Sequence, residues 1–193
     1  MTAKHKRIDD DTLHALNGIA YRDQAQTMPY DWATAGITAK FEIETEAGTV
    51  VLAATATGMT AHPTQVFTAA AGTDLLTCNG HGVKEGDQIV VASSVTLPTG
   101  LAASTRYFAV NVTPNAFALA TVPNSAPIDI TGAGSGTHTF YIVGSWQYDF
   151  SSVAAGTVGF FRGWASAWDG SSEIATFPAD EYGIPIEIVS KGN

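Results

Sequence analysis

The sequence predicts an all-β fold, and three observations support this prediction. Only 14% of the 193 residues are charged, so the Glu and Lys residues that fill surface helices are scarce. Many short segments alternate apolar and polar side chains with the two-residue period of a half-buried strand. Gly, Pro, Asn and Asp cluster between these segments, as they do in sandwiches and barrels.

Residues 1–29 are polar and irregular, and we expect them to form an N-terminal arm. Within the arm, apolar side chains are spaced loosely like one face of a short helix, with acidic residues near its start and Gly18 at its end. A helix this short is marginal alone, so we expect it to dock on a neighbouring subunit. The apolar side chains of this assembly arm are Ile8, Leu13, Leu16 and Ile19.

A regular alternation begins at Ile37 and predicts strands through the rest of the chain. Apolar residues occupy every second position from Ile37 to Ile43, residues 45–48 supply a turn, and residues 49–57 return, which predicts a hairpin. No segment after residue 30 has convincing helical periodicity. The later strands are expected over residues 65–70, 74–78, 88–93, 107–113, 116–121, 138–143, 146–150, 158–168, 173–177 and 184–189.

The charge and cysteine content exclude several classes of protein. The net charge of −9 repels phosphate backbones, so we expect no general binding of nucleic acid. Cys78 is the only cysteine, which rules out an internal disulfide. No apolar run approaches the ~20 residues needed to cross a bilayer. The charged N-terminus lacks a following apolar region, so we expect no signal peptide, and a protein that is made and kept in a cytoplasm or released from it by lysis.

No constellation in the sequence indicates catalysis, a cofactor or a metal centre. The histidines lack the spacing of metal ligands, and the Gly-rich residues 132–136 lead into a strand rather than the helix of a phosphate loop. We therefore expect no enzyme activity. A weak Ca²⁺ site among turn carboxylates stays open as an alternative. The turn carboxylates concerned are Asp87, Asp129 and Asp169.

Aromatic residues give the strongest candidates for a binding surface. Trp146 and Tyr148 share one face of an expected strand, and Trp164 and Trp168 share one face of another. Exposed aromatic rings on a sheet stack against sugars, which is one interpretation of these four residues. The interpretation that we favour is that they fill the core or a subunit interface.

Two separated parts of the chain carry short motifs that belong together. These motifs are Asp31 to Phe41, a turn at Gly48, Gly159 to Trp164, Asp169-Gly170, Thr176 to Pro178, and Gly183 to Ile186. In order and spacing they resemble the opening and closing strands of the immunoglobulin-like N-terminal domain of phage baseplate upper proteins. The match covers about half of the chain.

The segment between Pro63 and Tyr141 carries a second set of motifs. They are Phe67 to Ala69, Leu76-Thr77, His81-Gly82, Gly86-Asp87, Leu97 to Leu101, Tyr107 to Asn111, Phe117 to Leu119, and Gly134 to His138. This segment resembles a recurrent β module of phage tail and virion proteins, whose members have no known catalytic machinery.

Together the resemblances imply three parts and a structural role. We expect the arm (1–29), an immunoglobulin-like β-sandwich formed by residues 30–62 and 143–193, and an inserted β domain (63–142). The resemblances imply a non-enzymatic component of a tailed-phage virion, in the neck or collar, the baseplate or the head decoration. Its partners would be other virion proteins and copies of itself, without nucleic acid or membrane. The alternative is a glycan-binding adhesion module that is exposed on the virion and contacts host-surface glycan.

Overall fold

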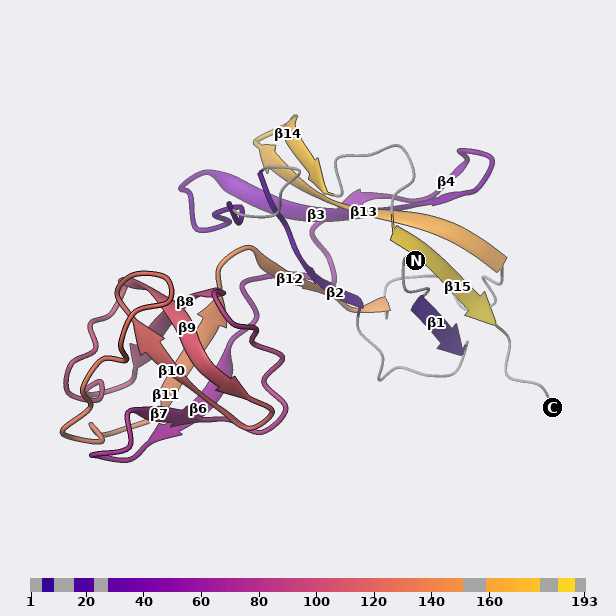
Figure 1. Cartoon of the computed structure of the whole chain (residues 1–193). Helices are drawn as coiled ribbons and strands as arrows, with labels where there is room; N and C mark the ends of the chain where they lie inside the picture. Colours follow the sequence, from indigo (N-terminus) through magenta and orange to yellow (C-terminus); the bar gives the residue numbers. More distant parts are fainter. Residues whose placement is uncertain (1–4, 9–15, 23–27, 151–158, 178–183, 190–193) are drawn as a thin grey trace. The chain divides into compact units, whose positions relative to one another are not determined.

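The all-β prediction is confirmed by a computed structural model. The structure describes residues 5–8, 16–22, 28–150, 159–177 and 184–189, and these contain fifteen strands and no α-helix. The chain forms two compact units (Figure 1). Unit 1 consists of residues 1–62 and 144–193, and unit 2 consists of residues 63–143. Each unit has its own hydrophobic core.

The larger sheet of unit 1, here called sheet A, has six strands. Its order is β1 (His5–Ile8), β15 (Ile184–Val189), β13 (Gly159–Asp169), β3 (Ile37–Thr45) and β4 (Val50–Thr55), and β14 (Ser172–Phe177) also pairs with β13. All pairs are antiparallel except β1 with β15. The pairing that we expected between the two separated parts of the sandwich is present, since β13 pairs with β3 from Phe161↔Thr45 to Asp169↔Ile37.

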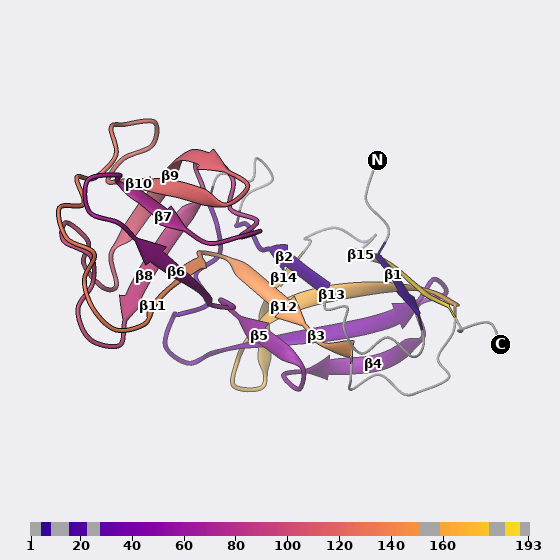
Figure 2. The ribbon, with the colours of Figure 1, turned by 90° about the horizontal axis from the view of Figure 1, so that it is seen from below.

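The smaller sheet of unit 1 has the order β2 (Leu16–Ile19), β12 (Ser145–Tyr148) and β5 (Met59–Ala61). Its apolar face packs on sheet A, and in Figure 2 it is seen in front of that sheet. The ring of Phe41 in β3 stacks on Tyr148 with ring centroids 4.4 Å apart. Unit 1 is therefore a two-layer, sandwich-like arrangement. The immunoglobulin-like label stays a prediction.

The prediction of a separate N-terminal arm with a short helix is wrong for those residues of the arm that the structure describes. Ile8 lies in β1, whereas Leu16 and Ile19 lie in β2, and Leu13 lies outside the described residues. Leu16 is buried in the core of unit 1. A short helix gains little by itself, whereas β12 offers open backbone groups and a core position for Leu16. Gly18 lies inside β2 rather than at the end of a helix, and a Cβ there would lie 2.9 Å from the Trp146 ring.

The two ends of the unit 2 segment leave unit 1 from adjacent strands. β5 and β12 pair antiparallel, with Trp146 opposite Ala61. The backbone N–H of His62 donates to Ser145 at 2.8 Å, and the N–H of Gly144 donates to the His62 Nε2 at 3.2 Å. These bonds keep the start and the end of the inserted segment next to each other.

Unit 2 is a closed barrel of six strands. Their order is β10 (Ala116–Ala120), β7 (Leu75–Thr77), β6 (Gln65–Ala69), β11 (His138–Ile142), β8 (Gln88–Ser93) and β9 (Arg106–Thr113). The loops at residues 94–101 and 128–137 also join, because Thr96 and Ser135 form a bridge and Thr99 N–H donates to Gly132 at 2.9 Å. Gly134 makes this approach feasible, since a Cβ there would lie 2.4 Å from the Thr96 carbonyl oxygen.

Candidate functional site

A hollow of about 230 Å³ lies on the face of sheet A that points away from the core of unit 1. We call it the outer hollow. Three neighbouring strands supply its lining, which combines carboxylates, hydroxyls and one aromatic ring. The lining residues are Glu42 and Glu44 of β3, Trp164 and Ser166 of β13, and Glu173 and Thr176 of β14.

Strand alternation explains why the carboxylates of β3 face the hollow. Phe41 and Ile43 are fully buried in the core, so Glu42 and Glu44 point to the opposite face. The same rule holds on β13. Ala165 is fully buried there, which turns Trp164 outward, directly opposite Glu42.

The β14 side of the hollow depends on an irregular pairing. The register of β13 and β14 shifts between Ala167 and Trp168, which places Glu173 opposite Trp168. The hydroxyl of Thr176 donates to the Glu173 carboxylate. This bond fixes one of the three carboxylates at the rim.

The hollow concentrates negative charge. Burial raises the pKa of Glu42, the negative charges of Glu44 and Glu173 raise it further, and a hydrogen bond from the Ala54 backbone lowers it. An ionised Glu42 is therefore disfavoured here relative to water. A ligand that donates hydrogen bonds to these carboxylates would relieve that cost.

A second tryptophan lies beside the hollow and has partners within the molecule. The indole Nε1 of Trp168 donates to the Ser166 hydroxyl oxygen at 2.8 Å. The Lys40 ammonium nitrogen lies 3.8 Å from the centroid of the Trp168 ring, close enough for a cation–π contact. Trp168 thus supports the lining, whereas Trp164 belongs to it.

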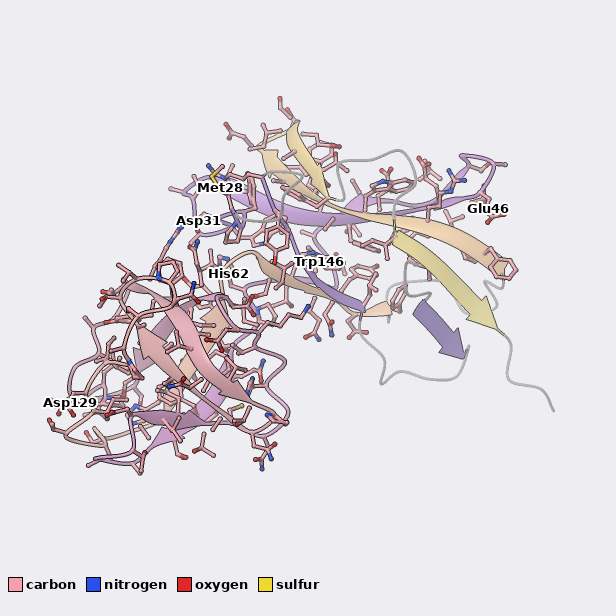
Figure 3. All side chains as sticks on the ribbon, viewed as in Figure 1. Met28, Asp31, Glu46, His62, Asp129 and Trp146 are labelled. Carbon is pink, nitrogen blue, oxygen red and sulfur yellow. The ribbon has the colours of Figure 1, made fainter. Side chains whose placement is uncertain are left out.

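The structure separates the four aromatic candidates into two pairs. Trp146 and Tyr148 are buried in the core of unit 1, which agrees with the core interpretation that we favoured for them and leaves neither ring on the surface for a glycan or a subunit. Figure 3 shows Trp146 within this unit and Glu46 projecting from the turn after β3. Only Trp164 and Trp168 lie on the outer face.

The buried histidines of unit 2 have structural roles. The Nδ1 of His81 accepts the Val83 N–H at 2.9 Å, so its Nε2 carries the proton and donates to the Thr113 carbonyl at 2.8 Å. His138 contacts the Ser93 hydroxyl and the Ala133 carbonyl at 3.0 and 3.1 Å. Both rings are satisfied by the barrel itself.

The surroundings of Cys78 disfavour a reactive thiolate. Its thiol donates to the Gln65 side-chain oxygen at 3.5 Å, and burial raises the pKa of the thiol. A raised pKa disfavours the nucleophilic thiolate.

The turn carboxylates do not assemble a metal site within the described part of the chain. No group of three or more His, Cys, Asp or Glu side chains is suitably placed there. Asp87 accepts the Lys84 N–H at 2.7 Å, which closes a turn, and burial raises the pKa of its carboxyl. No helix in the described residues is long and apolar enough to span a membrane.

Comparison with protein-family models, with curated proteins and with solved structures gave no match to this chain. Functional inference therefore depends on the residues of the chain itself.

Proposed function

We propose that the chain is a non-enzymatic structural component of a tailed-phage virion, located in the neck or collar, the baseplate or the head decoration. It acts in several copies through protein–protein contacts with other virion proteins and with copies of itself. The sequence resemblances supply the virion context. The observation that carries the assembly role is an exposed apolar region at one end of sheet A.

This apolar end consists of Val50 and Val51 of β4 and Phe160 of β13, which are 50%, 40% and 51% exposed. The registers Phe161↔Thr45 and Glu44↔Val50 place these residues at the same end of sheet A, with β3 between Phe160 and the two valines. Several exposed large apolar side chains at one end of a sheet are candidates for an interaction surface. Glu46 lies in the turn between β3 and β4, so a charged residue borders the apolar end, as in the polar rims of interfaces.

The backbone of β4 supports the same role. β3 is the only strand paired with β4 among the described residues, so β4 forms an edge of sheet A. Native edge strands are usually protected by charge, proline or bulges. β4 (Val50–Thr55) contains no charged residue and no proline, and two register shifts in its pairing with β3 are its sole protection of this kind. A strand from another subunit can add to such an edge.

The decisive experiment is mass spectrometry of purified phage particles, combined with two variants. The wild-type chain should be present in a copy number that matches a symmetric ring or vertex. Val51→Lys should lower incorporation at least about tenfold, because it places a charge in the interface, equivalent to roughly 1.4 kcal/mol. Val66→Lys is the matched control, since Val66 is 60% exposed but lies on the barrel of unit 2.

Both variants should unfold at the same temperature as the wild-type protein, because both positions are on the surface. Absence of the chain from finished particles would refute the virion role. Equal incorporation of the Val51 and Val66 variants would refute the part assigned to the apolar end.

A different observation favours the second candidate function, a glycan-binding adhesion module on the virion surface. Trp164 lines a hollow whose other groups are polar, which is the composition of a site for a small polyhydroxylated ligand. The two functions are compatible. The apolar end includes Phe160, four residues before Trp164 on β13, and does not include any residue of the outer hollow.

A further inference from the structure

We infer that the outer hollow binds one neutral or amino sugar unit and rejects acidic sugars. This ligand class deepens the glycan-binding candidate and does not depend on the assembly role. Four properties of the hollow lead to it: an aromatic platform, acceptor groups, a buried donor and a limited volume.

Trp164 supplies the platform. Its side chain is partly buried, so the ring is held by its surroundings while it lines the hollow. A pyranose ring presents a face of C–H groups, and this apolar face packs on an indole ring and is removed from water.

The carboxylates supply the acceptors and set the charge preference. Glu42, Glu44 and Glu173 surround the platform on two sides, because β3 and β14 flank β13. Sugar hydroxyls or an amino group donate to carboxylates in charge-assisted hydrogen bonds. A uronate, sialate or phosphate group would add a negative charge beside three others, so acidic sugars are disfavoured.

Ser166 is an independent indication of a ligand with an acceptor. It is only 3% exposed, yet it lines the hollow. Its oxygen accepts the Trp168 Nε1–H, and no acceptor for its own hydroxyl hydrogen is found among the described residues. A buried donor without a partner is costly, and a sugar hydroxyl oxygen can accept this hydrogen.

The volume limits the ligand to one sugar unit. Sites for drug-sized ligands have volumes of roughly 300–1,000 Å³. The outer hollow, at about 230 Å³, is smaller than this range. Further sugar units of a polysaccharide would therefore extend over the open face of sheet A.

A lysine side chain of a partner protein is the competing occupant. Its ammonium group would satisfy the carboxylates and lie against Trp164, as Lys40 does on Trp168. It has no acceptor for the Ser166 hydroxyl, however. The lining as a whole thus favours a sugar, which both donates and accepts.

The test is ligand-observed NMR on the full chain with four probes: methyl α-glucoside, glucosamine, glucuronic acid and lysine amide. We expect saturable binding of the glucoside or of glucosamine, and at least about tenfold weaker binding of glucuronic acid. Trp164→Ala should weaken sugar binding about tenfold or more, since the stacking platform is lost.

Matched variants separate the site from general effects of mutation. Phe160→Ala removes a ring from the same strand outside the hollow and should leave sugar binding unchanged. Glu44→Gln should reduce the discrimination against glucuronic acid, and Glu46→Gln should not. If Trp164→Ala does not fold, as judged by circular dichroism, the Glu44 and Glu46 pair still tests the site.

Three results would overturn the inference: no saturable binding of either favoured sugar, binding of lysine amide without binding of a sugar, or sugar binding that survives in Trp164→Ala. Particle incorporation is measured separately. Failure of the sugar site with normal incorporation would leave the assembly role intact.

Discussion

The two units differ in whether their sheets have edge strands. In unit 2 the six strands close into a barrel, so every strand has two neighbours and no edge is exposed. Among the described residues of unit 1, sheet A ends at β1 and β4, and the smaller sheet ends at β2 and β5. The barrel of unit 2 thus pairs its strands within itself, whereas the described part of unit 1 has edge strands, which is the feature that the proposed assembly role depends on.

The comparison predicts that the two units unfold separately. All four tryptophans lie in unit 1, so tryptophan fluorescence reports on unit 1 alone, whereas circular dichroism reports on both units. Variants in one unit should shift one transition and leave the other in place.

The largest effect is expected for Phe41→Ala in unit 1. Phe41 is fully buried, stacks on Tyr148, and lies so close to Gly163 that a Cβ there would be 2.6 Å from its ring. Loss of this ring should lower the free energy of unfolding of unit 1 by about 3–5 kcal/mol. Urea titration followed by tryptophan fluorescence measures it. Phe160→Ala, at an exposed position, should change it by less than about 0.5 kcal/mol.

The next effect is expected for Gly134→Ala in unit 2. Gly134 has a φ of +72°, and a Cβ would lie 2.4 Å from the Thr96 oxygen. Clash and backbone strain together should cost unit 2 about 3 kcal/mol. Circular dichroism should show this loss while the tryptophan signal is unchanged.

Gly72→Ala is the control for Gly134→Ala. Gly72 has a similar φ of +78° and no atom within 4 Å of its Cβ position. It should cost only about 1–2 kcal/mol, the strain of the left-handed conformation. Movement of the tryptophan transition by the Gly134 variant would contradict the independence of the units.

A smaller effect is expected for His81→Ala. The variant leaves the Val83 N–H and the Thr113 carbonyl without their partner in the barrel wall. Unit 2 should lose about 1–3 kcal/mol, with no change in unit 1. A change below about 0.5 kcal/mol would mean that water replaces the ring without cost.

The smallest effect is a pH dependence at Glu42. The pKa of Glu42 in the folded state is raised above the usual 4.5. Between pH 4.5 and this raised pKa, the folded state therefore binds more protons than the unfolded state does. The stability of unit 1 therefore falls as pH rises through this interval. Glu42→Gln should be more stable than wild type at neutral pH, by less than about 1 kcal/mol because the site is partly solvated.

Below pH 4.5 the stability gain of Glu42→Gln should disappear, because the carboxyl is then protonated in both states. Urea titrations at several pH values measure this. A gain that persists at low pH would assign the effect to packing. Glu46→Gln, at an exposed position outside the hollow, is the control.

Local pattern was sufficient to predict the long strands. The alternation from Ile37 to Ile43 predicted most of β3, and the later apolar runs predicted the barrel strands within one or two residues. The prediction is correct for these segments because one face of each strand is buried, which gives the two-residue period. The same alternation placed Trp164 and Trp168 on one face.

The pairing between strands far apart in the sequence could not be predicted from local pattern. β1 and β2 are four-residue strands whose partners lie more than a hundred residues away, so their own residues carry too little pattern to reveal them. Closure of the barrel depends on registers between distant strands in the same way. The outer hollow was missed for this reason too, although the outward positions of Glu42 and Glu44 were readable from the alternation.

The junction at His62 and Gly144 has a consequence for how this architecture can vary. The two connections to the barrel are antiparallel neighbours, joined by one backbone hydrogen bond and by one bond from the Gly144 N–H to the His62 side chain, all within unit 1. Any domain whose ends lie as close together can be exchanged there without rebuilding the host sheets. The junction is therefore a site where one inserted domain can replace another. Related chains could gain a different domain there by recombination, and a fluorescent or ligand-binding domain could be inserted there by design.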